Sequence, residues 1–257
     1  MSHTAFDPQL HSFAFVNMWE PDATDERQLA DASIGCLKQG RLVRAAAFGI
    51  ARALLHRDIR ALSQDPEHLS ARGYGLCGGM CFAVLDFYEA SLSIPKDIAN
   101  DRPGPGTKPR SYIWRRQIES LISDGARFVI WPFLLNHMPA IWPFPGGNLW
   151  LLTRSQKAWN GLKASLDSGK PVPLGLVRDT KNLFDNHQVL AIGYEEKNEK
   201  EGTIYAYDPN CPGQVSTISL KFGERSLDGR ESGNPSATLR GFFCEIYKPA
   251  DPRAAIE

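Results

Sequence analysis

The pattern of apolar residues changes abruptly at Gly169, and this change limits the folds that are open to the chain. Before Gly169, apolar residues recur at helical spacing, as in the run 155–167 that this glycine ends. After it, short apolar runs between turn residues predict five strands: Val172–Val177, Gln188–Tyr194, Thr203–Tyr207, Gln214–Leu220 and Leu239–Tyr247. Helices followed by strands indicate an α+β fold rather than alternating βαβ units.

The helical half divides into an extension and the start of a main domain. Residues 1–65 are predicted to form an extended arm followed by helices, because apolar residues between 42 and 62 lie near helical spacing. We expect this extension to pack on a main domain that covers 66–257, giving one compact unit. A helix is also predicted over 111–123, and the run 128–135 is interpreted as a strand.

Charge and composition exclude several classes of protein. Lys plus Arg and Asp plus Glu number 29 each, so no net field attracts nucleic acid. No stretch approaches the roughly 18 apolar residues of a membrane span, and the N-terminus lacks a secretory signal pattern. An odd number of scattered cysteines does not indicate a disulfide framework. We therefore expect reduced thiols and a cytoplasmic location; the oligomeric state stays open.

The sequence around Cys77 indicates a reactive cysteine. The glycine-bearing stretch 73–76 delivers Cys77 to the first turn of an apolar helix that is predicted to run to residue 90. The partial positive charge at a helix N-terminus favours thiolate over thiol. Gly78 and Gly79 follow directly and allow a substrate backbone to approach closely. On its own, a buried structural thiol would be the more ordinary interpretation.

A thiolate nucleophile needs a base, and His187 stands in a suitable place. His187 directly precedes an apolar strand, and Asp208 directly follows the next one. Antiparallel strands joined by a short turn would bring Asp208 beside His187. Asp208 would then hold one ring nitrogen and leave the other facing Cys77. Only the ordered set of three favours catalysis, since each residue alone has an ordinary structural explanation.

These motifs resemble those of papain-like cysteine peptidases, and most nearly the bacterial peptidases that remove double-glycine leaders from bacteriocins. The resemblance covers roughly residues 70–220 and rests on three features: Cys-Gly-x-x-Cys-x-Ala at a helix start, His before a strand that ends in Gly-Tyr, and a strand that ends in Asp-Pro. It implies a papain-like fold, with the nucleophile helix packed against a mostly antiparallel sheet, and a Cys77–His187–Asp208 triad.

Two details of the resemblance bear on the site. The family places a Gln a few residues before the nucleophile as an oxyanion donor, whereas Ala71 stands six residues before Cys77. The second donor is therefore unidentified. Aligning Cys81-Phe82-Ala83 with the Cys-Trp-Ala of papain would make Cys81 the nucleophile instead. We favour Cys77, because Cys81 lies a full turn inside the helix, where the effect of the helix end fades.

We therefore expect a cysteine-dependent hydrolase, a peptidase or amidase. It would act on a peptide or other amide substrate through a thioester acyl-enzyme, without a cofactor or a metal ion. A transglutaminase-like or other acyltransferase would use the same triad. A catalytically silent papain-like binding module is the third hypothesis, motivated by the missing Gln. A metal site at these residues is disfavoured, because the chain has no second close pair of ligands.

Overall fold

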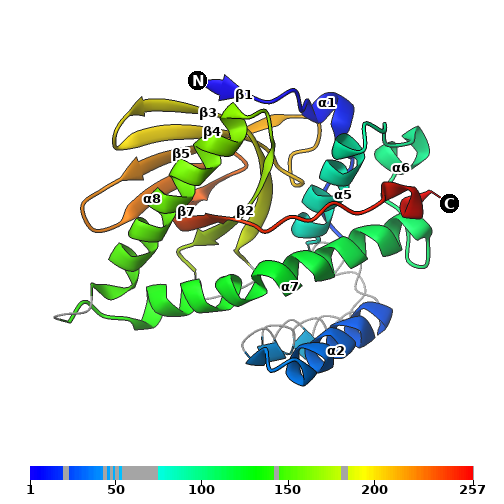
Figure 1. Ribbon diagram of the computed structural model, residues 1–257, viewed down its shortest axis with the longest axis horizontal. Helices are drawn as coiled ribbons and strands as arrows, with labels where there is room; N and C mark the ends of the chain where they lie inside the picture. The colour runs from blue at the N-terminus through cyan, green and yellow to red at the C-terminus, as the bar shows by residue number, and fades with distance from the viewer. Residues whose placement is uncertain are drawn as a thin grey trace.

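A computed structural model describes residues 1–19, 23–42, 45–46, 49, 52–53, 75–141, 145–180 and 185–256. Its helices are α1 (Pro8–His11), α2 (Ala23–Lys38), α5 (Cys77–Glu89), α6 (Lys96–Asn100), α7 (Lys108–His137), α8 (Gly146–Asp167) and the 3-10 helix η2 (Pro252–Ala255). Its strands are β1 (Ser2–His3), β2 (Val172–Arg178), β3 (His187–Asn198), β4 (Glu201–Tyr207), β5 (Val215–Phe222), β6 (Leu227–Glu231) and β7 (Asn234–Cys244). The strands gather on one side of the molecule, with α5, α7 and α8 beside them (Figure 1).

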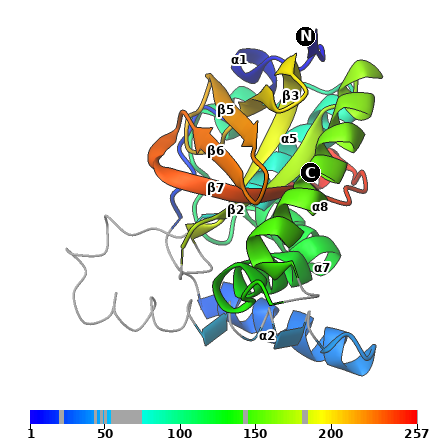
Figure 2. The same ribbon diagram turned by 90° about the vertical axis from the view of Figure 1, so that its left-hand side faces the viewer.

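Six of the strands close into an antiparallel barrel. The order β3-β2-β7-β6-β5-β4 returns to β3, because β3 pairs with both β2 and β4. Figure 2 shows β5, β6 and β7 curving round towards β2. The short β1 adds to β3 beyond the end of β2, with Ser2 opposite Tyr194. Closure leaves the six barrel strands without a free sheet edge along their paired lengths.

The closed barrel shows that the papain-like fold expected from the sequence is wrong. Helices beside a closed barrel are not a helical part packed against a sheet. Strand β6, which pairs with both β5 and β7 and so closes the barrel, was not predicted from the sequence. Its residues Leu-Asp-Gly-Arg-Glu contain one large apolar side chain, so no apolar run marks the strand. The last residue of β6, Glu231, is buried in an ion pair with Arg178. A charged residue thus occupies a buried position of this strand.

The helices also differ from the sequence-based expectations. Helix α7 runs unbroken from 108 to 137, so the strand predicted at 128–135 is wrong. Its aromatic content looks strand-like in sequence, but Trp131 packs its ring against Phe243 of β7 at 5.0 Å between centroids. Helix α8 begins at Gly146 rather than near Ser155. Most of the helical pattern at 42–62 lies outside the described residues.

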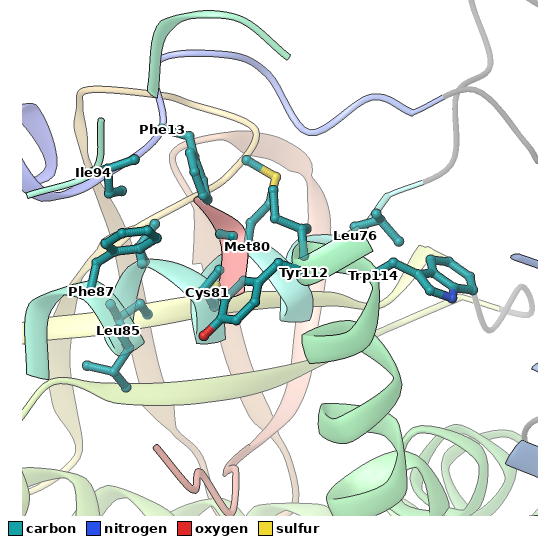
Figure 3. Packing of buried hydrophobic residues seen from close by; sticks show 14 of the residues in the cluster. Phe13, Leu76, Met80, Cys81, Leu85, Phe87, Ile94, Tyr112 and Trp114 are labelled. Atoms are coloured by element: carbon teal, nitrogen blue, oxygen red, sulfur yellow. The ribbon is translucent and has the colours of Figure 1, made fainter. Parts of the chain in front are cut away.

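Two apolar cores meet at β3, because its side chains alternate between them. Val189 and Ala191 belong to the core between the barrel and α8. Leu190 and Ile192 belong to the core between the barrel, α5 and α7. Figure 3 shows α5 inside this second core, surrounded by aromatic and aliphatic side chains. Every residue of α5 from 78 to 87 is buried, so its first turn is held firmly against β3.

The N-terminal arm belongs to this second core. Phe13 is 1% exposed and Trp19 is 2% exposed, and the N–H of Ala14 donates to Ala99 O at 2.7 Å. Helix α2 contacts α7 through an ion pair of 2.5 Å between Asp25 and Arg110. None of the described helices combines the length and apolar character needed to cross a membrane.

Candidate active site

Cys77 is the first residue of α5 and is partly exposed. The first backbone bond of the helix runs from Met80 N–H to Leu76 O at 2.8 Å, so the earlier N–H groups point out of its end. Gly79 N–H donates to Gln117 Oε1 at 2.8 Å. Among the described residues, none accepts a hydrogen bond from the N–H of Cys77 or Gly78. Two backbone donors are therefore open beside the thiol.

Cys81 has the opposite environment. It is 0% exposed, and burial raises the pKa of its thiol well above the ordinary value, with the nearby Cys77 and two acidic residues adding to the rise. A thiol that cannot ionise or meet substrate is a core residue rather than a nucleophile. This environment favours Cys77 as the reactive cysteine of the helix.

His187 and Asp208 lie in contact at one end of paired strands. Leu190 of β3 is opposite Tyr207 of β4, which places Asp208 next to the start of β3. His187 Nε2 and Asp208 Oδ1 are 2.7 Å apart, and both side chains are buried. Asp208 Oδ1 also accepts the N–H of Asn210 at 2.8 Å. The strand register thus brings these two predicted residues together.

The buried pair is held as an imidazolium and a carboxylate. Burial by itself would lower the pKa of His187, but the charge and hydrogen bond of Asp208, with those of Cys77, raise it to about 10. Burial would raise the pKa of Asp208, but His187 outweighs it and the pKa is lowered. Because Nε2 faces Asp208, Nδ1 is the ring nitrogen left for the thiol of Cys77.

A buried glutamine that was not predicted as a site residue, Gln188, also contacts Cys77. Gln188 Oε1 is 3.7 Å from Cys77 Sγ, and a Cβ on Gly78 would lie 2.3 Å from this oxygen. A side chain at position 78 would therefore displace the amide of Gln188 from its hydrogen bonds. Gln188 Nε2 donates to Glu245 Oε1 at 2.7 Å. Burial raises the pKa of Glu245 well above its usual value, which favours the protonated carboxyl.

Gln117 of α7 completes this polar network. Its Oε1 accepts the N–H of Gly79, which leaves its Nε2 to donate to Gln188 Oε1 at 3.4 Å. Both glutamines follow the nucleophile in sequence, whereas the resemblance predicts a glutamine before it. A signal was present for Gln188 alone, as a polar residue directly after His187 at the start of an apolar strand.

Other polar features lie outside this cluster. Surface hollows of about 430 Å³ and 790 Å³ adjoin α7, but neither is lined by Cys77. Within the described part of the chain, no three His, Cys, Asp or Glu side chains are arranged to hold a metal ion.

Comparison with known protein families, with curated proteins and with solved structures finds no match to this chain.

Proposed function

We propose that this chain is a cysteine-dependent hydrolase that cleaves peptide or other amide bonds through a thioester on Cys77. The observation that carries the proposal is the run of contacts from the partly exposed Cys77 through His187 to Asp208. Nucleophilic catalysis by a thiol uses this order of groups, with the acid fixing the base. The motif resemblance to papain-like peptidases supports the same three roles, although the fold differs.

In the first half of the reaction, the thiolate of Cys77 attacks the carbonyl carbon and a C–S bond forms. The oxygen that becomes negative would be stabilised by the open N–H groups of Cys77 and Gly78. His187 Nδ1–H then gives its proton to the leaving nitrogen, and the C–N bond breaks. Asp208 keeps the imidazole in place through Nε2.

In the second half, water attacks the thioester. His187, now neutral, takes a proton from the water, and the tetrahedral intermediate expels the thiolate of Cys77. The acid product leaves and the thiolate–imidazolium pair is restored. An amine in place of water would give the acyltransferase, so the acceptor alone separates the two enzymes. We also infer a reducing, cytoplasmic setting, because all five cysteines are free.

One contact favours a catalytically silent binding module as the second candidate. The oxygen of Gln188 lies where it accepts a hydrogen bond from the thiol of Cys77, and an acceptor favours the protonated form of a donor. A hydrolase must give up this contact when Cys77 ionises. A binding module would keep it.

Trapping the acyl-enzyme tests the proposal. We expect brief treatment with p-nitrophenyl acetate to place an acetyl group on Cys77, as mapped by mass spectrometry of peptides. Cys81→Ala serves as the matched control and should be acetylated at the wild-type rate, while His187→Ala should slow acetylation by at least about 100-fold. Equal acetylation of Cys77 in wild type and His187→Ala would refute the hydrolase. Competition between water and added methylamine for the acetyl group then measures hydrolysis against acyl transfer.

A further inference from the structure

Asn17 of the N-terminal arm contacts both halves of the candidate site. Its Oδ1 accepts the N–H of Leu76, the residue before Cys77, at 2.6 Å. Its Nδ2 donates to Asn210 Oδ1 at 3.3 Å, and its backbone N–H donates to Pro209 O at 3.0 Å. One side chain therefore joins the turn that carries the nucleophile to the turn that follows Asp208.

The orientation of the Asn17 amide is fixed by its neighbours. Trp19 Nε1–H donates to Oδ1 at 3.1 Å, and Leu76 N–H donates to the same oxygen. Two donors at this end leave the amide nitrogen to face Asn210 Oδ1. Asn210 Nδ2 then lies 3.3 Å from His187 Nε2, a packing contact, because this ring nitrogen gives its own proton to Asp208. The backbone N–H of Asn210 donates to Asp208 Oδ1 at 2.8 Å, so Asn17 is linked to the His187–Asp208 pair through Asn210.

Close packing leaves Asn17 little freedom to move. Its side chain is 9% exposed, and a Cβ on Gly75 would lie 2.8 Å from Nδ2. The flanking Phe15 and Trp19 are buried, with their rings 5.6 Å apart at right angles. The arm around Asn17 is therefore part of the core rather than a loose segment.

The Leu76 side chain is buried in the core, whereas the backbone N–H of Leu76 depends on Asn17. Leu76 is the N-cap residue of α5, and its side chain makes no capping hydrogen bond. Without Asn17, the N–H of Leu76 would be buried without its acceptor, which is unfavourable. Gly75, whose backbone is the most permissive of any residue, directly precedes it. A shift of about 1 Å between reacting groups lowers rates by about 100-fold.

We propose that Asn17 is a positioning residue that sets the Cys77 turn against the His187–Asp208 pair, so that the N-terminal arm is part of the active site. This inference rests on the proposed function. It identifies a contribution from a segment that lies outside the three sequence motifs and about 60 positions before the nucleophile.

The test compares the rate at which iodoacetamide modifies Cys77 in full-length variants, from pH 6 to pH 9.5. For Asn17→Ala we expect a fall of about 10- to 100-fold at pH 6–7, and a much smaller fall at pH 9.5, where the thiolate forms without the imidazolium. The matched control is Ser12→Ala, which removes a buried hydroxyl bonded to Pro8 O in the same arm but touches no site residue. This control should follow the wild-type profile.

Two further variants keep the test decisive. Asn17→Asp is isosteric and keeps an oxygen for Leu76 and Trp19, but loses the donor to Asn210, so we expect a smaller fall of about 3- to 10-fold. In the Asn210→Ala background, Asn17→Ala should lower the modification rate less than it does alone, because the contact between Asn17 and Asn210 is already lost. If Asn17→Ala does not fold, the modification rate of the isosteric Asn17→Asp decides the test.

The outcomes separate this inference from the proposed function. Wild-type reactivity at pH 6 that does not depend on His187 would overturn the hydrolase itself. Reactivity that depends on His187 but stays within twofold of wild type in folded Asn17→Ala or Asn17→Asp would overturn the role of Asn17 alone. A uniform fall at every pH, matched by Ser12→Ala, would show a merely structural role and also overturn it.

Discussion

The two ends of helix α5 are built in opposite ways. At its C-terminal end, Asp86 is 1% exposed and accepts hydrogen bonds from Tyr112, Tyr247 and the N–H of Ala250 at 2.7–2.9 Å. Arg116 adds an ion pair, with Nε 2.7 Å from Asp86 Oδ2. At the N-terminal end, the N–H groups of Cys77 and Gly78 have no acceptor among the described residues.

The C-terminal end of α5 is fixed by hydrogen bonds, whereas its N-terminal end carries the groups of the proposed reaction. Both carboxylate oxygens of Asp86 accept hydrogen bonds, and the C-terminal tail is tied to α5 and α7. Burial still raises the pKa of Asp86 against the attraction of Arg116, so the cluster fixes a position more than it adds net stability. At Cys77, two N–H groups without an acceptor among the described residues adjoin a partly exposed thiol, where the proposed reaction would develop a negative charge.

The largest effect is expected at the closed end of the helix. Asp86→Ala should lower the free energy of unfolding by about 3–5 kcal/mol, because the buried Arg116 would lose its buried carboxylate partner and keep only the exposed Glu119. Urea titration followed by circular dichroism measures this. Cys77 in the folded fraction should keep its wild-type rate of modification. A loss of stability below about 1 kcal/mol would remove the contrast between the two ends.

A smaller effect is expected from filling the space beside the nucleophile. Gly78→Ala should destabilise the chain by about 1–3 kcal/mol, because its Cβ would meet the amide of Gln188 at 2.3 Å. It should also slow modification of Cys77 by displacing its neighbour. Gly161→Ala is the matched control, because nothing lies within 4 Å of a Cβ there and alanine favours the helix. Equal stability of the two variants would contradict the close packing.

A third effect, which varies with pH, concerns the charge of the buried pair. The pKa of His187 is raised from 6.5 to about 10, so its contribution to stability is complete below pH 6.5 and is lost as the pH rises through 10. The pKa of Asp208 is lowered, so its contribution is present above 3.8 and is lost as the pH falls through the folded value. The pair therefore stabilises most between about pH 4 and 6.5.

Asp208→Asn tests this window. The melting temperature should fall relative to wild type by about 2–4 °C for each kcal/mol lost, with the largest gap near pH 6 and a shrinking gap towards pH 10. Differential scanning calorimetry at several pH values follows it. A gap that widens above pH 7 would mean that His187 is neutral in the folded chain.

The sequence predicted the parts of the site that depend on strand order. His187 and Asp208 meet because β3 and β4 are consecutive antiparallel strands, which the apolar runs indicated. Asn17 and Gln117 could not be predicted, because their contacts join segments far apart in the chain and leave no local pattern. The barrel was missed for a related reason, since β6 is too polar to be recognised and the pairing of β3 with both β2 and β4 is a property of the whole sheet.

The most direct test of the account is the rate at which iodoacetamide modifies Cys77 from pH 5 to pH 10, in wild type and in His187→Ala. At pH 6, an isolated thiol with a pKa of about 8.5 is almost entirely protonated. The account predicts rapid modification of Cys77 at this pH, ahead of the other four cysteines, and a fall of at least about tenfold in His187→Ala, because the imidazolium no longer stabilises the thiolate. Identical profiles in the two proteins, both rising only near pH 8.5, would contradict it and leave the binding module as the better description.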